Sequence, residues 1–513
     1  MSKETKEFTN KIIHFSEIDD LVEKMRSSGK KITLCHGVFD LLHPGHIRHL
    51  AKAKELGEIL IVSITADKYV NKGPGRPAFP ESLRAESLAN IISVDYVIIT
   101  PFQTAIEILN AVKPNNYVKG NDYVDEDSDK TGNIVREREI VESHGGKILY
   151  TDEIVFSSSQ LINKFIPSHS SEVSKWLRDL KLDYTKTEIL NWLDKVSELK
   201  VTVIGEAILD LYTECDALGK SAKDPVLCFN KGPTVSYAGG ILAIGAHVNG
   251  LGANTTIVTG LNGMDLDLDQ IKNLKTKGIN LQSLEIAPSP TIRKQRFVDS
   301  RTSTRVLELY EMDDVPLTAE KDKEFIRLIS ESISDVDAVI VADYGHGLIS
   351  EKAINHLASS GKFLAVNAQT NAGNRGFNSI TRYPKMDFIT LNGMEAKLET
   401  RRRHIEMKSF IEQLQKISST NQIVVTRGGD GMDIFSKNKK FCHSPALAPF
   451  VRDRVGAGDV VLAITSLLAA LKAPPEIIGF YGNICGAWAV SYNGNEKTLD
   501  KGTLVRQITS ILA

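Results

Sequence analysis

Two histidines stand three residues apart where a hydrophobic run gives way to a helix-like segment. His43 and His46 lie in the stretch CHGVFDLLHPGHIRHL, after the strand-like run KITLC. Backbone N–H groups at a helix start attract phosphate, and Gly37 and Gly45 allow the backbone to approach it closely. We therefore expect both histidines to contact a phosphate group.

A metal site and a purely structural role are the alternatives for this pair. A metal centre needs further histidine, cysteine or carboxylate ligands at suitable spacing, and Asp40 alone lies nearby in the sequence. The position of the pair at a helix start favours phosphate over both alternatives.

A second candidate site is the stretch VRDRVGAGDVVLAITSLLAAL, in which GAGD opens a long apolar helix. One interpretation is a tight turn with Asp459 as the helix N-cap. The other is a functional site. The family resemblance given below implies phosphoryl transfer to a hydroxyl group, with Asp459 accepting the hydroxyl proton and the backbone N–H groups of Gly456, Ala457 and Gly458 holding the developing charge.

Short β-rich runs alternate with helical patterns twice along the chain, which indicates an α/β protein with two doubly wound, Rossmann-like domains. The first set consists of KITLCHGVF, EILIVSITA, DYVIIT, NYVKG and KILYT. The second begins at KVTVIGEAILD and continues through TTIVTG, DAVIVADYG, KFLAVNAQ, DFITLNG and QIVVTRGG. A polar stretch without strand signals lies between them. We expect domains at residues 1–166 and 200–513, joined by a helical linker at 167–199.

The composition limits the possible partners. The 62 Lys and Arg residues are balanced by 64 Asp and Glu residues, so we expect no broad basic surface for nucleic acid or anionic membrane. The five cysteines are scattered, which argues against disulfides and a thiolate zinc site and favours the cytoplasm. The start, MSKETKEFTN, has no apolar core, and the longest apolar stretch is shorter than the ~20 residues of a membrane span. We expect a soluble protein.

The first domain resembles the cytidylyltransferase-like nucleotidyltransferases over about residues 28–166. His43, Gly45 and His46 match the HxGH signature, and KGPGRP, SVDYV, VKGNDY and FSSSQLI follow in the family's order. The match is most similar to the sugar-phosphate adenylyltransferase half of bifunctional ADP-heptose synthases, and glycerol-3-phosphate cytidylyltransferase is a more distant relative. The resemblance implies that these residues bind nucleotide or phosphate: Gly37, Phe39, Asp40, His43, His46, Lys72, Arg76, Lys119, Asp122, Ser157, Ser158 and Ser159.

The second domain resembles the ribokinase-like (PfkB-type) sugar kinases over about residues 200–513. VIGEAILD, SYAGGILAIGAHVNGLGA, VADYGHGL, ITLNGMEA, VTRGGDGM and DRVGAGD appear in the family's order. The resemblance implies that Asn392 and Glu395 serve phosphate and Mg²⁺, with Glu395 at the metal. It places Asp210, Gly239, Gly240 and Asp343 near the sugar. DPVLCFNKG and TIRKQRFVDSRTSTRVLEL look like a small β lid, which implies a homodimer formed through the lid.

The two resemblances together imply a bifunctional enzyme. The kinase phosphorylates the anomeric carbon of a sugar phosphate, and the transferase activates that phosphate with ATP or another nucleoside triphosphate. Mg²⁺ accompanies the nucleotide, and no tightly bound organic cofactor is expected. Since attack by a phosphate needs no general base, histidine and lysine donors suffice in the first domain. The alternatives are CTP-dependent activation of another sugar or polyol phosphate, and a kinase domain that has become a regulatory module.

Several kinase positions depart from the heptose-kinase pattern. Glu206 stands where close relatives have Asp, GGILAIGA replaces a motif ending in Ala-Ala-Asn, and NAQT followed by NAGNRGFN replaces DPKG. The two domains are also in reversed order relative to the usual heptose enzyme. Since buried polar groups around a sugar decide which hydroxyls are bound, we expect these changes to alter sugar choice.

Overall fold

The computed structural model describes residues 9–70, 76–120, 133–151, 170–401, 406, 409, 410, 412, 414, 420–437 and 441–512. The chain forms two compact units, one of Met1–Ser170 with Val505–Ala513 and one of Ser171–Leu504. Each is an α/β unit with a parallel sheet, which confirms the predicted fold class. The exact domain limits at 166 and 199 stay a prediction.

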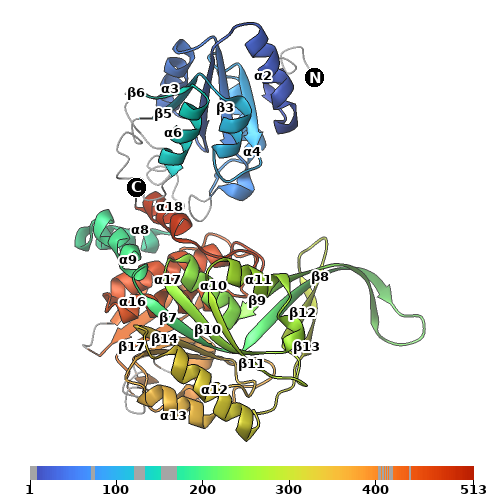
Figure 1. Ribbon diagram of the computed structural model, residues 1–513, viewed down its shortest axis with the longest axis vertical. Helices are drawn as coiled ribbons and strands as arrows, with labels where there is room; N and C mark the ends of the chain where they lie inside the picture. Colours follow the sequence, from blue (N-terminus) through green and yellow to red (C-terminus); the bar gives the residue numbers. More distant parts are fainter. Residues whose placement is uncertain are drawn as a thin grey trace. The chain divides into compact units, whose positions relative to one another are not determined.

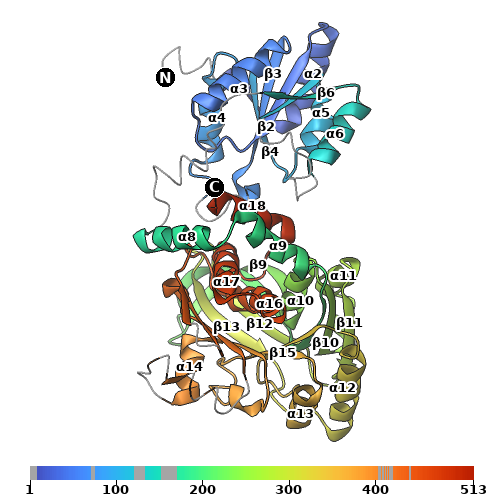
Figure 2. The ribbon, with the colours of Figure 1, turned by 90° about the vertical axis from the view of Figure 1, so that its left-hand side faces the viewer.

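The first unit contains a six-stranded parallel sheet with helices on both faces (Figure 2). The strands lie in the order β1 (Ile12–Ile13), β4 (Tyr96–Thr100), β3 (Ile59–Thr65), β2 (Ile32–Gly37), β5 (Asn116–Gly120) and β6 (Lys147–Thr151). Helices α2 (Ile18–Ser27), α5 (Ile106–Val112) and α6 (Asn133–Ser143) share one core cluster. Helices α3 (Pro44–Glu55) and α4 (Glu81–Ala89) share the other. Ile61 and Val62 of β3 point to opposite clusters, so this strand is buried on both faces.

The strand order of the first unit reverses between β2 and β5. From β2 the chain moves outward through β3 and β4, and it then crosses back to β5 on the other side of β2. In an open parallel sheet, the carboxyl ends of the strands at such a reversal form a crevice in which ligands bind. Here those ends are Gly37 and Gly120, and Gly37 leads directly to the histidine pair.

The second unit contains a nine-stranded sheet. The strands lie in the order β11 (Asn280–Glu285), β10 (Asn254–Leu261), β7 (Lys200–Gly205), β14 (Ala338–Asp343), β15 (Phe363–Ala368), β16 (Phe388–Asn392), β17 (Gln422–Thr426), β18 (Met432–Ser436) and β19 (Phe441–Ser444). In this spatial order, the strands from β11 through β10, β7, β14, β15 and β16 to β17 are parallel to one another. Strands β18 and β19 pair antiparallel at one edge. Its order reverses between β7 and β14, which places the expected crevice after Gly205 and Asp343.

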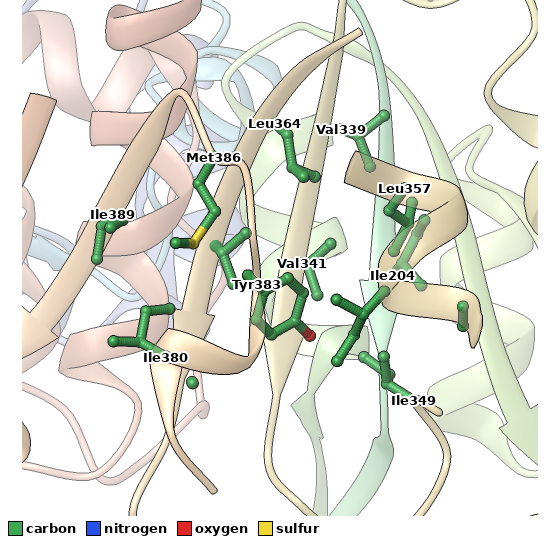
Figure 3. Packing of buried hydrophobic residues seen from close by; sticks show 14 of the residues in the cluster. Ile204, Val339, Val341, Ile349, Leu357, Leu364, Ile380, Tyr383, Met386 and Ile389 are labelled. Carbon is green, nitrogen blue, oxygen red and sulfur yellow. The ribbon is translucent and has the colours of Figure 1, made fainter. Parts of the chain in front are cut away.

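Helices cover both faces of the nine-stranded sheet. Helices α12 (Ala319–Ser332) and α13 (Glu351–Ser359) lie on one face (Figure 1), where a large apolar cluster unites them with the strands. Figure 3 shows part of this cluster, with Tyr383 and Met386 packed beside Val341 and Leu364. Helices α10 (Ile241–Gly250), α16 (Ala457–Ala470) and α17 (Pro475–Ala489) are on the other side of the sheet. Almost every residue of α16 is buried, since helices also pack around it.

A separate four-stranded sheet stands beside the carboxyl ends of β7 and β14. Its order is β13 (Arg305–Glu311), β12 (Ile292–Asp299), β8 (Ala207–Lys220) and β9 (Leu227–Gly240). Strands β8 and β9 form a long hairpin that projects from the unit (Figure 1). We call this sheet the lid. The sequence had indicated β9, β12 and β13, but it missed β8, because Glu206 alone separates β8 from β7.

Further helices complete the described chain. They are α8 (Ser171–Asp183), α9 (Lys186–Val196), α11 (Asp269–Thr276), α14 (Gly393–Thr400) and α18 (Lys501–Ile511). Helix α9 is fixed to α17, because the hydroxyl of Tyr481 donates a 2.6 Å hydrogen bond to the carbonyl of Ile189. Within the part of the chain that the structure describes, no helix combines the length and apolar character needed to cross a bilayer.

Candidate active sites

The histidine pair lies at the start of α3, at the crevice of the first unit. Strand β2 ends at Gly37, and Phe39 follows with a φ of 47°, which turns the chain toward the helix. His43 is the N-cap of α3, and Pro44 occupies the first helical position. The ring centroids of His43 and His46 are 4.0 Å apart, and the ring of Phe39 is 5.3 Å from that of His46. The structure therefore brings Phe39, His43 and His46 together.

The geometry of His43 determines which ring nitrogen carries the proton. The backbone N–H of Gly45 donates to Nδ1 of His43 over 3.1 Å, so Nδ1 is an acceptor and the neutral ring holds its proton on Nε2. Burial lowers the pKa of His43, which keeps the ring neutral at pH 7. Nε2 is buried and has no hydrogen-bond partner among the described residues. His43 thus presents an unused N–H donor at a helix start, as a phosphate ligand requires.

Asp40 and Arg76 hold the loop before α4 in place. The carboxylate of Asp40 is 2% exposed and accepts the backbone N–H of Ala78 at 2.6 Å and of Phe79 at 3.2 Å. It also accepts Nη1 of Arg76 at 3.4 Å. This carboxylate therefore shapes the loop that follows the predicted KGPGRP motif. A direct contact of Asp40 with a nucleotide stays a prediction.

Arg84 is a site residue that the sequence reasoning missed. Its guanidinium, 1% exposed, donates to the carbonyls of Val38 at 2.5 Å, Thr65 at 2.9 Å and Phe79 at 3.0 Å. It also pairs with Asp67 at 2.6 Å. Val38 follows β2, Thr65 ends β3, and Phe79 precedes α4. Arg84 therefore joins the three segments that surround the crevice. A lone Arg in a helical pattern gives no signal of this role.

Lys119 reaches the crevice from β5. Its ammonium forms a 2.6 Å ion pair with Glu137 of α6, and the hydroxyl of Tyr117 donates to the same carboxylate at 3.1 Å. Burial and the charge of Lys119 lower the pKa of His36 to about 3. Lys119 thus lies near His36 at the end of β2 with its charge paired to Glu137, and its contact with a phosphate stays a prediction. Five other predicted ligands lie outside the described residues: Lys72, Asp122, Ser157, Ser158 and Ser159.

A metal centre is the alternative for the histidine pair. Among the described residues, no group of three or more His, Cys, Asp or Glu side chains is arranged to hold a metal ion.

The GAGD sequence forms the first turn of α16. Gly456 is the N-cap with a φ of 79°, and an added Cβ would lie 2.3 Å from Oδ1 of Asn495, so only glycine fits there. A Cβ on Gly458 would meet open space. Asp459 is the third helical residue, so the interpretation of Asp459 as an N-cap is wrong. The N–H of Ala457 donates a long 3.4 Å hydrogen bond to the carbonyl of Arg454, and the start of such a helix attracts anions, so a phosphate contact here stays a prediction.

Asp459 is a buried carboxylate held by two neutral donors. The hydroxyl of Tyr344 donates to Oδ1 at 3.0 Å, and Nε2 of Gln369 donates to the same oxygen at 3.1 Å. Burial raises the pKa of Asp459 to about 6, and the nearby charge of Asp210 adds to the shift. A carboxylate with a pKa near neutrality, beside an anion-binding helix start, is suited to accept a hydroxyl proton during phosphoryl transfer.

Asp210 and the two glycines form one wall of this site. Oδ1 of Asp210 pairs with Nη1 of Arg296 at 2.5 Å, and its other oxygen accepts from Asn495 at 3.4 Å. A Cβ on Gly239 would lie 2.2 Å from Oδ2 of Asp210, and one on Gly240 would lie 2.6 Å from a backbone oxygen. The glycines therefore let β9 pass directly over Asp210. Contact of these three residues with a sugar stays a prediction.

Glu206 and Asp343 support the loop that follows β14. Glu206 accepts the backbone N–H groups of Tyr344 at 3.0 Å and His346 at 3.1 Å. Asp343 accepts the hydroxyl of Tyr383 at 2.8 Å and the N–H of Gly345 at 2.9 Å. Burial raises the pKa of both carboxyls. Both carboxyls hold the loop that carries Tyr344, and a sugar contact of Asp343 stays a prediction.

The unusual NAQTNAGNRGFN segment consists mainly of scaffold residues. The side-chain amides of Asn371, Asn374 and Asn378 donate to backbone carbonyls of Asp343, Tyr344 and Gln369, with distances of 2.7–2.9 Å. These amides therefore support the backbone, and an effect of the segment on sugar choice stays a prediction. Gln369 is the exception, because it bonds to Asp459.

Asn392 and Glu395 form a capping box at the start of α14. Asn392 accepts the N–H of Met394 and of Glu395, each at 2.9 Å, and Glu395 accepts the N–H of Asn392 at 2.8 Å and of Thr370 at 3.1 Å. Burial raises the pKa of Glu395 to about 7. A single buried carboxylate fits Mg²⁺ that arrives on nucleotide phosphates and keeps several waters, but it does not make an all-protein cage.

Comparison with known proteins agrees with this geometry. Residues 198–501 match the pfkB family of carbohydrate kinases, and residues 34–164 match the cytidylyltransferase-like family. The chain belongs to the pfkB carbohydrate kinase family, and a cytidylyltransferase-like domain precedes its kinase domain. Both resemblances inferred from the motifs are thus confirmed.

Curated relatives and solved structures are similar to parts of the chain. The bifunctional protein HldE of Syntrophotalea carbinolica is 34% identical over 154 residues, 30% of each chain. HldE of Nitratiruptor sp. is 44% identical over 121 residues, 23% of this chain and 26% of that protein. The matched segments span about a third or less of these relatives' length. The structure of phosphofructokinase-2 from Escherichia coli with potassium covers 61% of this chain and 99% of its own, with a TM-score of 0.50 and 13% identity, a likeness of fold.

Proposed function

We propose that the chain is a bifunctional enzyme of the ADP-heptose synthase type. It phosphorylates the anomeric hydroxyl of a sugar phosphate and then joins the new phosphate to a nucleotide. The observation that carries the proposal is the difference between the two sites. The kinase site has a buried base beside an anion-binding helix start, whereas the histidine site has neutral and cationic donors. This pair of sites matches two successive reactions.

In the first reaction, the sugar hydroxyl oxygen attacks the γ-phosphorus of ATP. Asp459 accepts the hydroxyl proton, and the first turn of α16 holds the charge on the transferred group. The O–P bond to the β-phosphate breaks, and ADP leaves. The intact base and helix start argue against a kinase domain that has become a regulatory module.

In the second reaction, an oxygen of the sugar 1-phosphate attacks the α-phosphorus of a nucleoside triphosphate, and pyrophosphate leaves. The attacking oxygen is already anionic, so no base is needed. Nε2–H of His43 serves to hold phosphate, and Lys119, which is ion-paired with Glu137, adds a donor at the end of β5. The assay with each nucleoside triphosphate tests whether the nucleobase is adenine or cytosine.

Glu395 would hold hydrated Mg²⁺ that accompanies the nucleotide at the kinase site, and the ion, when bound, would neutralise phosphate charge. The lid supports a homodimer, because Leu218, Leu227, Leu307 and Leu309 expose 49–71% of their surface there. The cysteines are all free in the structure, which agrees with a cytoplasmic enzyme.

The proposal is tested by incubating the full chain with Mg²⁺, each nucleoside triphosphate and a panel of hexose and heptose phosphates. Products are followed by mass spectrometry. We expect a sugar bisphosphate with ATP, and a nucleotide sugar once a sugar 1-phosphate is present. Formation of the nucleotide sugar with CTP alone would favour the cytidylyl version. Absence of any phosphorylated sugar, with the second reaction intact, would show that the kinase domain has another role.

A further inference from the structure

The inner face of the lid carries a cross-strand row of polar and aromatic side chains. The register aligns Lys294 of β12 with Tyr310 of β13 on one side and with Asp210 of β8 on the other, and Asp210 is aligned with Tyr237 of β9. Residues aligned across a sheet point to the same face. Lys294 therefore shares the face of Asp210, which lines the kinase site.

The neighbouring cation on this face is already neutralised. Arg296, two residues along β12, pairs with Asp210 at 2.5 Å and with Glu308 at 3.4 Å. Its charge is thus held by two carboxylates of the lid itself. A further anion entering the site would have to displace one of them.

Lys294 has no such partner. Its side chain is buried, with 7% exposed, and it makes no hydrogen bond or ion pair with any residue that the structure describes. Its ammonium lies 5.2 Å from the ring centroid of Tyr310 and 5.7 Å from that of Tyr344. Burial lowers its pKa, and the charges of Asp210, Asp459 and Glu206 act in the opposite direction. An ammonium on a side chain that is only 7% exposed, without a hydrogen-bond acceptor among the described residues, is unfavourable, so its presence calls for an anionic ligand.

The position of Lys294 on the lid points to the acceptor sugar. In the proposed function, the first turn of α16 meets the charge of the transferred phosphoryl group. A lysine is a compact charge with three rotatable donors, which suits a phosphate whose orientation differs among sugars. The site also contains Asp459, so a substrate that brings a phosphate into it needs a cation nearby.

We propose that Lys294 binds the phosphate ester that the sugar substrate already carries, and that it makes the kinase select phosphorylated sugars over plain ones. This inference rests on the proposed kinase function. It adds a specificity-determining residue that neither motif contains. The γ-phosphoryl group of ATP has the same chemistry as the phosphate ester of the sugar. The experiment below distinguishes which of the two Lys294 binds.

The experiment compares the wild-type chain with Lys294→Met and Lys294→Arg. Each protein is assayed with a sugar phosphate that the wild type uses and with the same sugar lacking that phosphate. Lys231→Met, an exposed lysine on lid strand β9, is the matched control. For Lys294→Met we expect kcat/KM to fall by about 10- to 100-fold with the sugar phosphate, mainly through KM, the loss typical of a charged hydrogen bond. Turnover of the plain sugar should stay within about twofold, and Lys294→Arg should restore part of the loss.

Each result has a distinct meaning. A loss confined to the phosphorylated sugar supports the proposal, and Lys231→Met should leave both substrates unchanged. An equal fall in kcat with both sugars would overturn it and assign Lys294 to the transferred phosphoryl group. Unchanged kinetics in Lys294→Met would overturn it as well. If Lys294→Met is too unstable to assay, Lys294→Arg decides alone, and a KM effect equal for both sugars counts against the proposal. Failure of the wild type to phosphorylate any sugar phosphate would instead reject the proposed function.

Discussion

Replacing Asp459 by asparagine should make the kinase unit more stable while removing its activity. An asparagine oxygen accepts the same hydrogen bonds from Tyr344 and Gln369, so the contacts survive and only the buried charge is lost. Without its base, sugar phosphorylation should fall at least ~10²-fold. The gain in stability follows from the pKa of Asp459, which is about 6 in the folded protein against an ordinary value of 3.8.

The sign and size of that gain depend on pH. Because the folded-state pKa is raised, the folded protein holds the proton more strongly, and its stability falls as the pH rises from 3.8 through about 6. The penalty amounts to about 3 kcal/mol at pH 7.5 and about 1 kcal/mol at pH 4.5. Asp459→Asn removes it. The free energy of unfolding should therefore rise by about 3 kcal/mol at pH 7.5 and by much less at pH 4.5.

Urea unfolding followed by tryptophan fluorescence measures this change in the correct unit. All three tryptophans, Trp176, Trp192 and Trp488, belong to the second unit. Asp267→Asn is the control, because the Asp267 side chain is 94% exposed and its replacement should change little at either pH. Destabilisation at pH 7.5, or an equal gain at both pH values, would refute the account of Asp459 as a buried, strained carboxylate.

Three further predictions concern the separation of the sites and their supports. His46→Ala should lower nucleotidyl transfer by about 10²- to 10³-fold and leave sugar phosphorylation unchanged, and loss of both in a folded protein would contradict two independent sites. The kinase rate should fall as the pH drops through about 6, because Asp459 must be ionised to accept a proton; a flat profile from pH 5 to 8 would exclude it as the base. Arg84→Met should destabilise the first unit by about 3 kcal/mol. Thermal inactivation of nucleotidyl transfer would show this loss, while the tryptophan transition of the second unit should not move.

Much of the fold could be predicted because parallel strands buried on both faces appear as continuous apolar runs. Strands β2 to β6 and β7, β10, β14, β15, β16 and β17 each coincide with such a run. The sequence could not reveal β8, which continues β7 after Glu206, or β1, which has only two residues. Strand β1 depends on pairing with the distant strand β4, and β8 follows β7 so closely that the local pattern shows no boundary between them.

The residues of the candidate sites could be predicted where they form a local motif, and not where their role depends on distant contacts. The histidine pair and GAGD were found because each is a local motif at a helix start, where backbone geometry alone creates an anion site. Arg84 and Lys294 were missed because their importance depends on partners, or on the lack of them, across distant strands. The asparagine-rich segment shows the same limit. Its side-chain amides donate to backbone carbonyls at the end of β14 and just after it, and a local pattern does not show this role.

Gln369 links the unusual segment to the chemistry of the kinase site. It stands in the NAQT sequence that replaces DPKG, at the position of the lysine, and it donates a neutral hydrogen bond to Asp459. A lysine at that distance would stabilise the ionised carboxylate more strongly and lower its pKa, because an opposite charge favours the charged form. The neutral hydrogen bond from Gln369 also lowers the pKa of Asp459, but burial outweighs it and keeps that pKa near 6. The substitution therefore preserves a base with a pKa close to neutrality, and Lys294 is left to provide positive charge on the lid.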